Sequence, residues 1–243
     1  MYRQGFFVRT NFASKYFLRV SYLIQFKEIV TSIMIALFVT ITIYIVLYVF
    51  IEVAKRKFLV ENAFSRNVAH VSTGILSFFL PYYLMPSQIV VLMLLIAGLL
   101  FYTKRARLLP GIHVTGRKSF GEIYYPLGIG VSALVCLPGN IVSFQFGIWI
   151  LTLSDTLAGM IGGRFGGKKI SFWSKEKTVK GTLSFFIMTF IISGYYFFII
   201  GKFNMVEIFL LTFILTFIEF ILVSGLDNLV LPVLASSLFM LLV

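Results

Sequence analysis

The chain has 243 residues, of which 59% are hydrophobic and 12% are charged, and its mean hydropathy is +0.98. This composition excludes an ordinary soluble domain, in which about a quarter of the residues are charged. The formal net charge of +12 is not a sign of nucleic-acid binding, because the basic residues gather in loops between apolar runs. One cysteine, Cys136, excludes a disulfide framework within the chain.

Residues 1–28 are predicted to form a basic amphipathic segment that is distinct from the rest of the chain. Apolar residues recur there at helical spacing, from Phe12 to Ile24, while polar residues such as Lys15 and Gln25 lie roughly opposite. The pattern favours a helix in the membrane interface, and a re-entrant or additional span is the alternative. Residues 29–243 are predicted to form a single transmembrane domain.

Runs without charged residues predict the membrane-crossing helices, since a helix needs about 20 apolar residues to cross the hydrocarbon core. Two of these runs are long enough for two spans each, with breaks near Pro81 and Pro86 in one and at Pro138 in the other. The sequence therefore predicts an all-α, polytopic integral membrane protein of about seven or eight transmembrane helices. The apolar runs are 29–51, 67–103, 123–154, 181–201, 206–223 and 228–243.

Three basic loops, at residues 52–66, 104–118 and 164–180, separate the runs. If two spans connect successive loops, all three loops lie on one face of the membrane, which the positive-inside rule makes the cytoplasmic face. The turn at 225–228 follows two further crossings and is expected on the same face. Charged residues from four separate loops are thus predicted to meet at one side of the membrane.

The first polar motif along the chain pairs Arg66 with His70, one helical turn apart at the start of a span. The alternative to a functional pair is an interfacial arginine with a buried, hydrogen-bonded histidine. The second motif opens a later span with Ser119 and Glu122. Glu122 is either a functional carboxylate or the N3 residue of a capping box in which Ser119 is the N-cap.

The third motif, in residues 153–182, is the most specific. Asp155, Ala158, Gly159, Gly162 and Gly166 advance by three or four positions, so they share one helical face. Small residues on such a face pack membrane helices together, but an ionisable residue among them is usually functional. Glycines and lysines follow, and exposed backbone N–H groups beside cations are what a nucleoside triphosphate requires.

The fourth motif is Glu219 followed by Asp227 and Asn228. Glu219 lies near the end of an apolar helix, where an unpaired carboxylate is costly, and its candidate partners are Arg66, His70 or a bound metal. Asp227 and Asn228 would complete a metal site or place a general base beside a substrate hydroxyl. The ordinary alternative is that Asn228 caps the last helix.

Taken in order, these motifs resemble those of one family of membrane enzymes. Asp-x-x-Ala, Gly-x-x-Phe-Gly and Lys-Thr-x-x-Gly-Thr within residues 155–182 look like the CTP-binding segment of dolichol kinases, phytol kinases and CTP-dependent diacylglycerol kinases. Arg…His, Ser-x-Gly-Glu-x-x-Tyr and Glu…Asp-Asn-x-x-x-Pro are similar to the other motifs of that family. Asn67 is a departure, because the family usually has lysine there. The resemblance covers about Glu52 to Pro232.

The resemblance implies a kinase that phosphorylates the hydroxyl of a membrane lipid alcohol, which is a polyprenol, a dolichol, a phytol-like alcohol or diacylglycerol. CTP is the implied phosphoryl donor and Mg²⁺ the implied cofactor. Asp155, Asp227 and Asn228 are the expected metal ligands. The expected catalytic residues are Asp155, Asp227, Glu219, Glu122 and His70. The expected nucleotide-binding residues are Arg66, Gly162, Gly163, Gly166, Gly167, Lys177, Thr178, Lys180, Gly181 and Thr182.

Two other functions compete with this interpretation. A CTP-dependent cytidylyltransferase acting on a phosphorylated lipid needs the same nucleotide and metal, but the serine- and aspartate-rich C-terminal signature of such enzymes is missing. A small transporter would also carry acids within its membrane helices. Transporters tend to place them near the bilayer midplane, whereas Asp155, Glu122, Glu219 and Asp227 are all predicted near one face.

Overall fold

The computed structural model of the chain describes the backbone of residues 5–59, 61–113, 119–172, 175–222 and 224–243. Side chains are described at residue 22 and from residue 25 onward within these ranges, except 169–176. The chain divides into two units, Met1–Thr40 and Ile41–Val243, and the second unit contains every candidate site residue.

Helix α1 extends from Gly5 to Phe58, and its backbone continues through residue 28 without a break. The amphipathic pattern predicted for residues 1–28 rests mostly on side chains outside the described residues, so it stays a prediction. Residues Gln25–Phe58 are long and apolar enough to cross a membrane. The basic residues of the last turn, Lys55, Arg56 and Lys57, follow this stretch.

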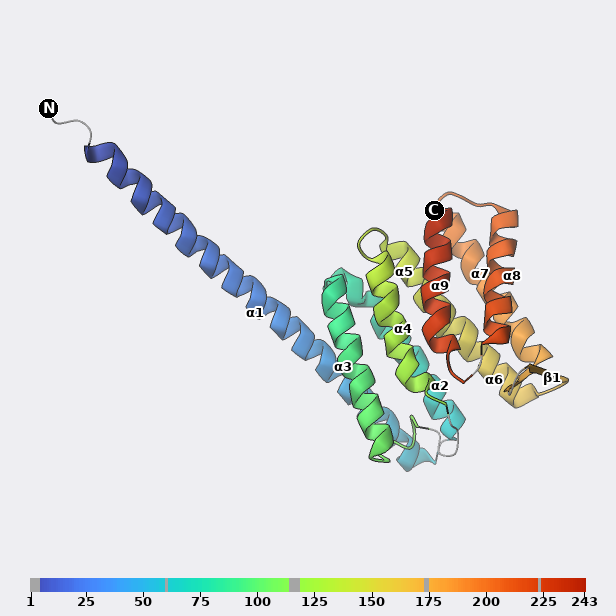
Figure 1. The fold of residues 1–243 in the computed structure, drawn as a ribbon. Helices are drawn as coiled ribbons and strands as arrows, with labels where there is room; N and C mark the ends of the chain where they lie inside the picture. Colours follow the sequence, from blue (N-terminus) through green and yellow to red (C-terminus); the bar gives the residue numbers. More distant parts are fainter. Residues whose placement is uncertain (1–4, 60, 114–118, 173–174, 223) are drawn as a thin grey trace. The chain divides into compact units, whose positions relative to one another are not determined.

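The second unit is a bundle of helices (Figure 1) that turns back on itself at the predicted breaks. Pro81 lies in the short 3₁₀ turn after α2, Pro86 opens α3, and residues 137–140 separate α4 from α5. Its helices are α2 (Asn62–Phe79), η1 (Leu80–Tyr82), α3 (Pro86–Arg105), α4 (Gly121–Cys136), α5 (Ile141–Trp149), η2 (Ile150–Asp155), α6 (Thr156–Phe165), α7 (Val179–Ile199), α8 (Met205–Ile221) and α9 (Asp227–Leu242).

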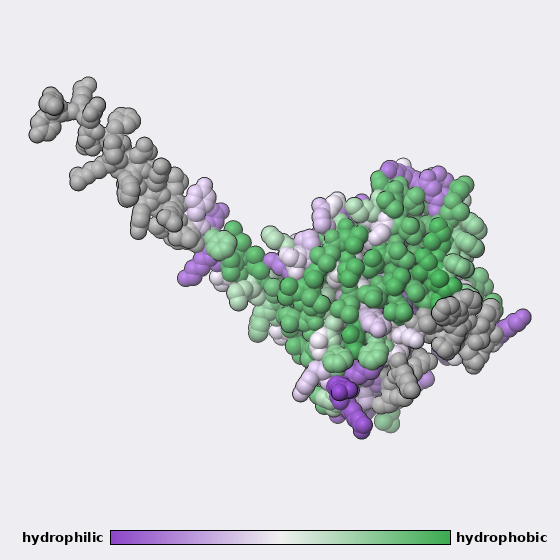
Figure 2. Space-filling view, viewed as in Figure 1, coloured by the Kyte–Doolittle hydropathy of each residue, from purple (hydrophilic) through white to green (hydrophobic). Residues whose placement is uncertain are grey.

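The protein is an all-α integral membrane protein, as predicted. Among the described residues, four helical stretches have the length and apolar composition to cross a membrane, and two more apolar helices, α4 and α9, are shorter. Figure 2 shows a broad hydrophobic band across the visible face of the bundle, with hydrophilic side chains toward its two ends. The number of crossings, about seven or eight, stays a prediction.

Helix α8 shows how these helices present two different faces. Phe209, Phe213 and Phe217 are spaced four residues apart and are at least half exposed, as expected for side chains that contact lipid. Thr212, Thr216 and Glu219 lie on the other side and are buried. In this helix the polar residues therefore point into the protein and the aromatic residues point outward.

An aromatic cluster joins α5, α7 and α9. The rings of Phe146 and Phe239 stack with centroids 4.4 Å apart, and Tyr196 and Phe197 contact Phe239 edge-on. All four side chains are buried, and such pairs contribute roughly 0.5–1.5 kcal/mol each beyond their burial. This core holds together the helices whose other ends carry the candidate site.

A short antiparallel hairpin interrupts the helical architecture between α6 and α7. Strands β1 (Lys169–Phe172) and β2 (Lys175–Thr178) pair in a register that sets Lys169 opposite Thr178. The sequence analysis predicted only a basic loop here, because four-residue strands rich in lysine carry little strand signal. The hairpin places Lys177 and Thr178 immediately before α7.

Candidate functional site

The four motifs come to one end of the bundle. In Figure 1, the starts of α2, α4 and α9 and the ends of α6 and α8 lie at the same end, beside the hairpin. Arg66 lies near the start of α2 and Glu122 in the first turn of α4, while Asp227 opens α9. Residues as far apart in the chain as Arg66 and Asp227 therefore contribute to one region, because short connections return successive helices to the same end of the bundle.

Asp155 is the last residue of a π-helical segment, η2, inside the continuous helical stretch Ile141–Phe165. Its carboxylate interacts electrostatically with those of Asp227 and Glu219 and with the cations of Lys177 and Arg66. Single π-helical turns are rare and often occur at functional sites. We refer to Asp155, Asp227 and Glu219 as the acidic cluster.

Glu219 of the acidic cluster forms an ion pair with Lys177. The ammonium group of Lys177 contacts both the side-chain Oε1 and the backbone carbonyl of Glu219, and both side chains are largely buried. This pair ties the hairpin to the end of α8. The sequence analysis considered Arg66, His70 or a metal as the partner of Glu219 and did not foresee Lys177.

Arg66 and His70 lie on α2 beside the acidic cluster. Arg66 is half-buried and forms no ion pair with any residue that the structure describes, yet its charge acts on both Asp155 and His70. His70 is buried against the ring of Tyr125, with centroids 4.5 Å apart. Within the described part of the chain, the Nε2 atom of His70 has no hydrogen-bond partner.

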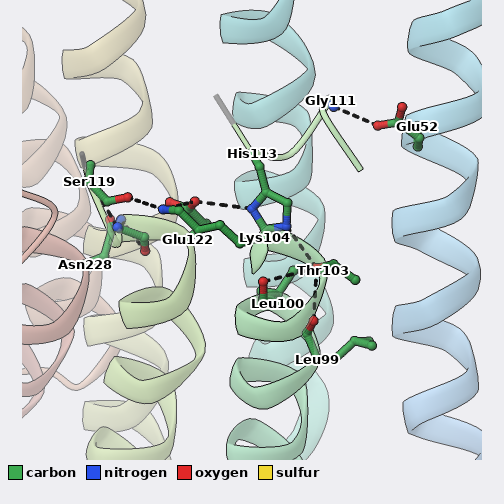
Figure 3. A network of polar contacts seen from close by, with 11 residues as sticks. Glu52, Leu99, Leu100, Thr103, Lys104, Gly111, His113, Ser119, Glu122 and Asn228 are labelled. Atoms are coloured by element: carbon green, nitrogen blue, oxygen red, sulfur yellow. Dashed lines mark hydrogen bonds and ion pairs between the residues drawn. The ribbon is translucent and has the colours of Figure 1, made fainter. Parts of the chain in front are cut away.

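Glu122 does not belong to a capping box with Ser119. The N-cap of α4 is Phe120, without a side-chain cap, and Glu122 lies in the first turn. Its Oε1 accepts hydrogen bonds from Lys104 Nζ at 2.7 Å and from His113 Nδ1 at 3.2 Å (Figure 3). Ser119 instead accepts from the N–H of Gly121 at 3.2 Å. The capping interpretation was wrong because the last turn of α3 supplies a cation, and the following loop an imidazole, that bind the carboxylate.

Asn228 does not cap α9, which begins at Asp227 with Leu226 as its N-cap. The side chain of Asn228 is only 1% exposed, and its Nδ2 donates to the carbonyl oxygen of Gly121, 2.9 Å away, on α4. Its Oδ1 has no partner among the described residues. A buried amide oxygen without a partner is costly, and it is also a suitable ligand for a hard cation.

Part of the glycine-rich segment packs two helices together. A Cβ atom on Gly162 would lie 2.6 Å from Thr178 Oγ1 and 3.4 Å from the Cα of Gly181. The Thr178 hydroxyl accepts from the N–H of Gly181 at 3.1 Å and thereby caps α7. Gly162, Thr178 and Gly181, all expected to bind nucleotide, thus form the crossing of α6 and α7.

The other glycines and Lys180 shape the turn after α6. Gly166 and Gly167 have φ values of +51° and +104°, which residues with a Cβ rarely adopt. Lys180 Nζ donates to the Phe165 carbonyl at 3.3 Å, so it satisfies the C-terminal end of α6. Two other residues that were predicted to bind nucleotide are packed less tightly. A Cβ on Gly163 would meet nothing within 4 Å, and Thr182 is half-buried in α7.

The residues present fit Mg²⁺ that binds together with a phosphorylated ligand. Among the described residues, no group of three or more His, Cys, Asp or Glu side chains is arranged to hold a metal alone. Mg²⁺ commonly takes one or two carboxylates and completes its coordination with water and substrate phosphates. Asp155 and Asp227 are two interacting carboxylates, and Asn228 adds the buried Oδ1.

Sequence reasoning missed three residues that shape this region. Lys104 was read only as a loop charge, and His113 and Tyr125 were given no role. Tyr125 donates its hydroxyl to the His70 carbonyl at 2.8 Å and lies 3.1 Å from Thr152 Oγ1. The motif Ser-x-Gly-Glu-x-x-Tyr includes Tyr125, so a signal for it was present. For His113 the sequence offers none beyond its place in a basic loop.

Two curated proteins are similar to this chain. A phytol kinase from Synechocystis sp. is 29% identical over 99 residues, which are 40% of this chain and 42% of that protein. A probable chloroplastic phytol kinase from Zea mays is 30% identical over 174 residues, or 64% of this chain and 55% of that protein. The chain is thus similar to two phytol kinases over part of its length.

The chain spans only about half the length of these phytol kinase relatives, between 42% and 55%. No family model and no solved structure matches the chain. The similarity to phytol kinases agrees with the motif order read from the sequence. It does not test the roles of the individual site residues, which stay predictions.

Proposed function

We propose that this protein is a kinase that transfers the γ-phosphoryl group of CTP to the hydroxyl of a membrane lipid alcohol. A phosphotransferase acting on an alcohol is the activity that the names of its relatives support. An isoprenoid alcohol of the phytol type is the first acceptor to test. CTP as the donor rests on the resemblance of residues 155–182 to CTP-binding segments, and the cytoplasmic position of the site rests on the distribution of basic loops.

The observation that best supports this proposal is the acidic cluster and its neighbouring cations. Asp155 interacts with two other carboxylates and with Lys177 and Arg66 at one end of a membrane bundle. The two cations offset part of the repulsion that Asp155 experiences from the other carboxylates. A metal-bound polyphosphate offers both a cation for the carboxylates and anions for the basic side chains. Phosphoryl transfer needs little else from a protein than such positioning and charge neutralisation.

Each group then has a defined role. Asp155, Asp227 and Asn228 would hold Mg²⁺, which when bound neutralises phosphate charge. Arg66 is the cation most available to the triphosphate, because it has no ion-pair partner among the described residues. Lys177 is already paired with Glu219, so it would be shared between Glu219 and phosphate or exchanged from one to the other.

The transfer step balances without another reactant. The lipid hydroxyl oxygen forms a bond to the γ-phosphorus while the bond from that phosphorus to the β–γ bridging oxygen breaks. CDP leaves, and the hydroxyl proton passes to a carboxylate of the acidic cluster. His70 and Tyr125, which are buried side by side on α2 and α4, would orient the acceptor on the membrane side of the cluster.

One labelling experiment tests this function. The purified protein in lipid nanodiscs is incubated with Mg²⁺, CTP labelled at the γ- or the α-phosphate, and phytol, a dolichol or diacylglycerol. We expect γ-label in the lipid product, with phytol as the best acceptor. Appearance of α-label in a phospholipid product would identify a cytidylyltransferase instead. Absence of label from either position with every acceptor would refute kinase activity.

A further inference from the structure

A network of polar contacts around Glu122 connects α3, α4 and α9, and the proposed reaction does not use it directly (Figure 3). Lys104 and His113 both donate to the same oxygen of Glu122, at 2.7 and 3.2 Å. Lys104 also donates to the backbone carbonyl of Ser119, just before α4. These contacts hold the first turn of α4 against the end of α3 and the loop that follows it. Glu122 thus has partners on the protein side, unlike a carboxylate that awaits substrate.

The ring of His113 is fixed at both nitrogens. Its Nε2 lies 2.9 Å from Thr103 Oγ1, and the side chain is 6% exposed. The Glu122 carboxylate can only accept, so Nδ1 of His113 carries the proton in this contact. Thr103 Oγ1 also donates to the backbone carbonyls of Leu99 and Leu100, 3.0 and 3.1 Å away, so it is itself held in place on α3. The contact with Thr103 therefore holds the ring in the orientation in which Nδ1 faces Glu122.

The loop that carries His113 is itself anchored. The N–H of Gly111 donates to Glu52 Oε2 on α1 at 2.7 Å, and the carbonyl of Gly111 accepts from Ser65 Oγ on α2 at 2.7 Å. Glu52 is buried and also binds Arg56. His113 thus projects from a loop that two helices hold in place, two residues from this anchor.

On its other side, the network reaches the acidic cluster. The residue before Glu122 is Gly121, whose carbonyl accepts from Asn228 Nδ2 at 2.9 Å. This bond decides which end of the Asn228 amide faces α4, and it leaves Oδ1 as the end without a described partner. The neighbouring residue is Asp227, which interacts with Asp155. The position of the first turn of α4 therefore sets the orientation of Asn228.

We propose that His113 is a positioning residue for the phosphoryl-transfer site. Together with Lys104 it holds Glu122, so that the Gly121 carbonyl keeps the Asn228 oxygen turned toward the place of the bound Mg²⁺–nucleotide. Glu122 accordingly holds the helix end and takes no part in the reaction. This inference rests on the proposed function, and it assigns a role to a residue that none of the four motifs contains.

A pair of substitutions at His113 tests this role. Asparagine places its amide nitrogen where Nδ1 of histidine lies, so His113→Asn keeps the donor to Glu122, whereas His113→Leu removes it. Two quantities are measured: phosphoryl transfer, and the Mg²⁺ concentration at half-maximal thermal stabilisation by CTP. We expect His113→Leu to weaken Mg²⁺ binding and lower kcat by about 10- to 100-fold, the usual effect of losing an outer-shell partner. KM for the lipid alcohol should stay unchanged, and His113→Asn should restore most of both losses.

The predicted coupling to Asn228 gives a second readout. Asn228→Ala should show the same loss of Mg²⁺ affinity, and the double variant with His113→Leu should lose little more, because both changes act through one contact. Additive losses would contradict the proposed connection. If His113→Leu does not fold, two variants of Thr103 replace it. Thr103→Val removes the hydroxyl that contacts the His113 ring, and Thr103→Ser keeps it. We then expect the loss of Mg²⁺ affinity and kcat in Thr103→Val and not in Thr103→Ser.

The inference and the proposed function fail in different ways. A folded His113→Leu protein with the kcat and Mg²⁺ dependence of the wild type would overturn the positioning role while leaving the kinase intact. If the wild type transfers no phosphate but His113→Leu still raises the Mg²⁺ concentration needed for thermal stabilisation by CTP, the positioning role is supported and the proposed reaction is refuted.

Discussion

At the scale of single residues, Asp155 has the most unusual surroundings. It ends a π-helical turn within a membrane helix, and two other carboxylates and two cations act on it. Ionisable groups at such positions are expensive, and they are usually kept for function. The sequence alone singled out Asp155, because a carboxylate stood out on a face of small residues. Its neighbours Lys177 and Arg66 could be placed beside it only by the fold.

Replacing Asp155 by asparagine tests its role with little change in shape. We expect Asp155→Asn to reduce phosphoryl transfer by at least about 1000-fold, a loss comparable to removing a principal electrostatic group from a transition state. Folding should be retained or improved, since one of three mutually repelling carboxylates is removed. Transfer assays and thermal melts are run beside Glu61→Gln, which neutralises an exposed acid. Near-normal turnover of Asp155→Asn would exclude the metal site.

Arg66 is expected to bind the triphosphate, since it has no ion-pair partner in the described part of the chain. We predict that Arg66→Gln raises KM for CTP by roughly tenfold or more, the loss of one charge-assisted contact of about 1.5–3 kcal/mol. KM for the lipid alcohol should not change. Arg105→Gln, at the exposed end of α3, is the matched control. An equal effect of the two substitutions would show that Arg66 contributes only general positive charge.

At the scale of elements, the crossing of α6 and α7 explains part of the glycine-rich motif. Gly162 and Gly181 let the two helices approach, while Thr178 caps α7 at the same point. The hairpin that ends in Thr178 also carries Lys177, so this crossing fixes where Lys177 meets Glu219. The packing interpretation is therefore confirmed for Gly162 and Gly181, and the role of the motif in ligand binding stays a prediction.

Alanine at two adjacent glycines separates packing from helix propensity. Gly162→Ala would place a methyl group 2.6 Å from Thr178 Oγ1, so we expect it to lower the melting temperature. The loss of the cap alone costs about 1 kcal/mol. Gly163→Ala meets nothing within 4 Å and should stabilise α6 by roughly 0.5–1 kcal/mol. Thermal melts of the two variants in one detergent are compared; equal melting temperatures would argue against the tight crossing.

At the scale of the whole molecule, the arrangement of helices could be predicted from the sequence better than the contacts between side chains could. Charge-free runs and prolines located the helices and their breaks, because the bilayer demands long apolar segments. The partner of Glu219 and the contacts of Glu122 and Asn228 were not foreseen. Each depends on a residue from another part of the fold, Lys177, His113 or Gly121. Local patterns such as capping boxes carry no information about such partners.

The hairpin and the π-helical turn are two further features that the sequence did not predict. The strands have only four residues each, and a π turn differs from an α-helix by one extra residue, so neither leaves a periodic pattern. Both lie next to predicted site residues, Asp155 and Lys177. Departures from the regular helical pattern thus occur where the site is built, as is common in functional regions.

The central claim is that four separated motifs form one nucleotide site. A structure of the protein in lipid nanodiscs with Mg²⁺ and a non-hydrolysable CTP analogue tests this claim most directly. We predict a metal held by Asp155 and Asp227, with Asn228 Oδ1 turned toward it and the triphosphate beside Arg66. A nucleotide bound away from the acidic cluster, or one that leaves Asp227 and Arg66 without contact, would contradict the account.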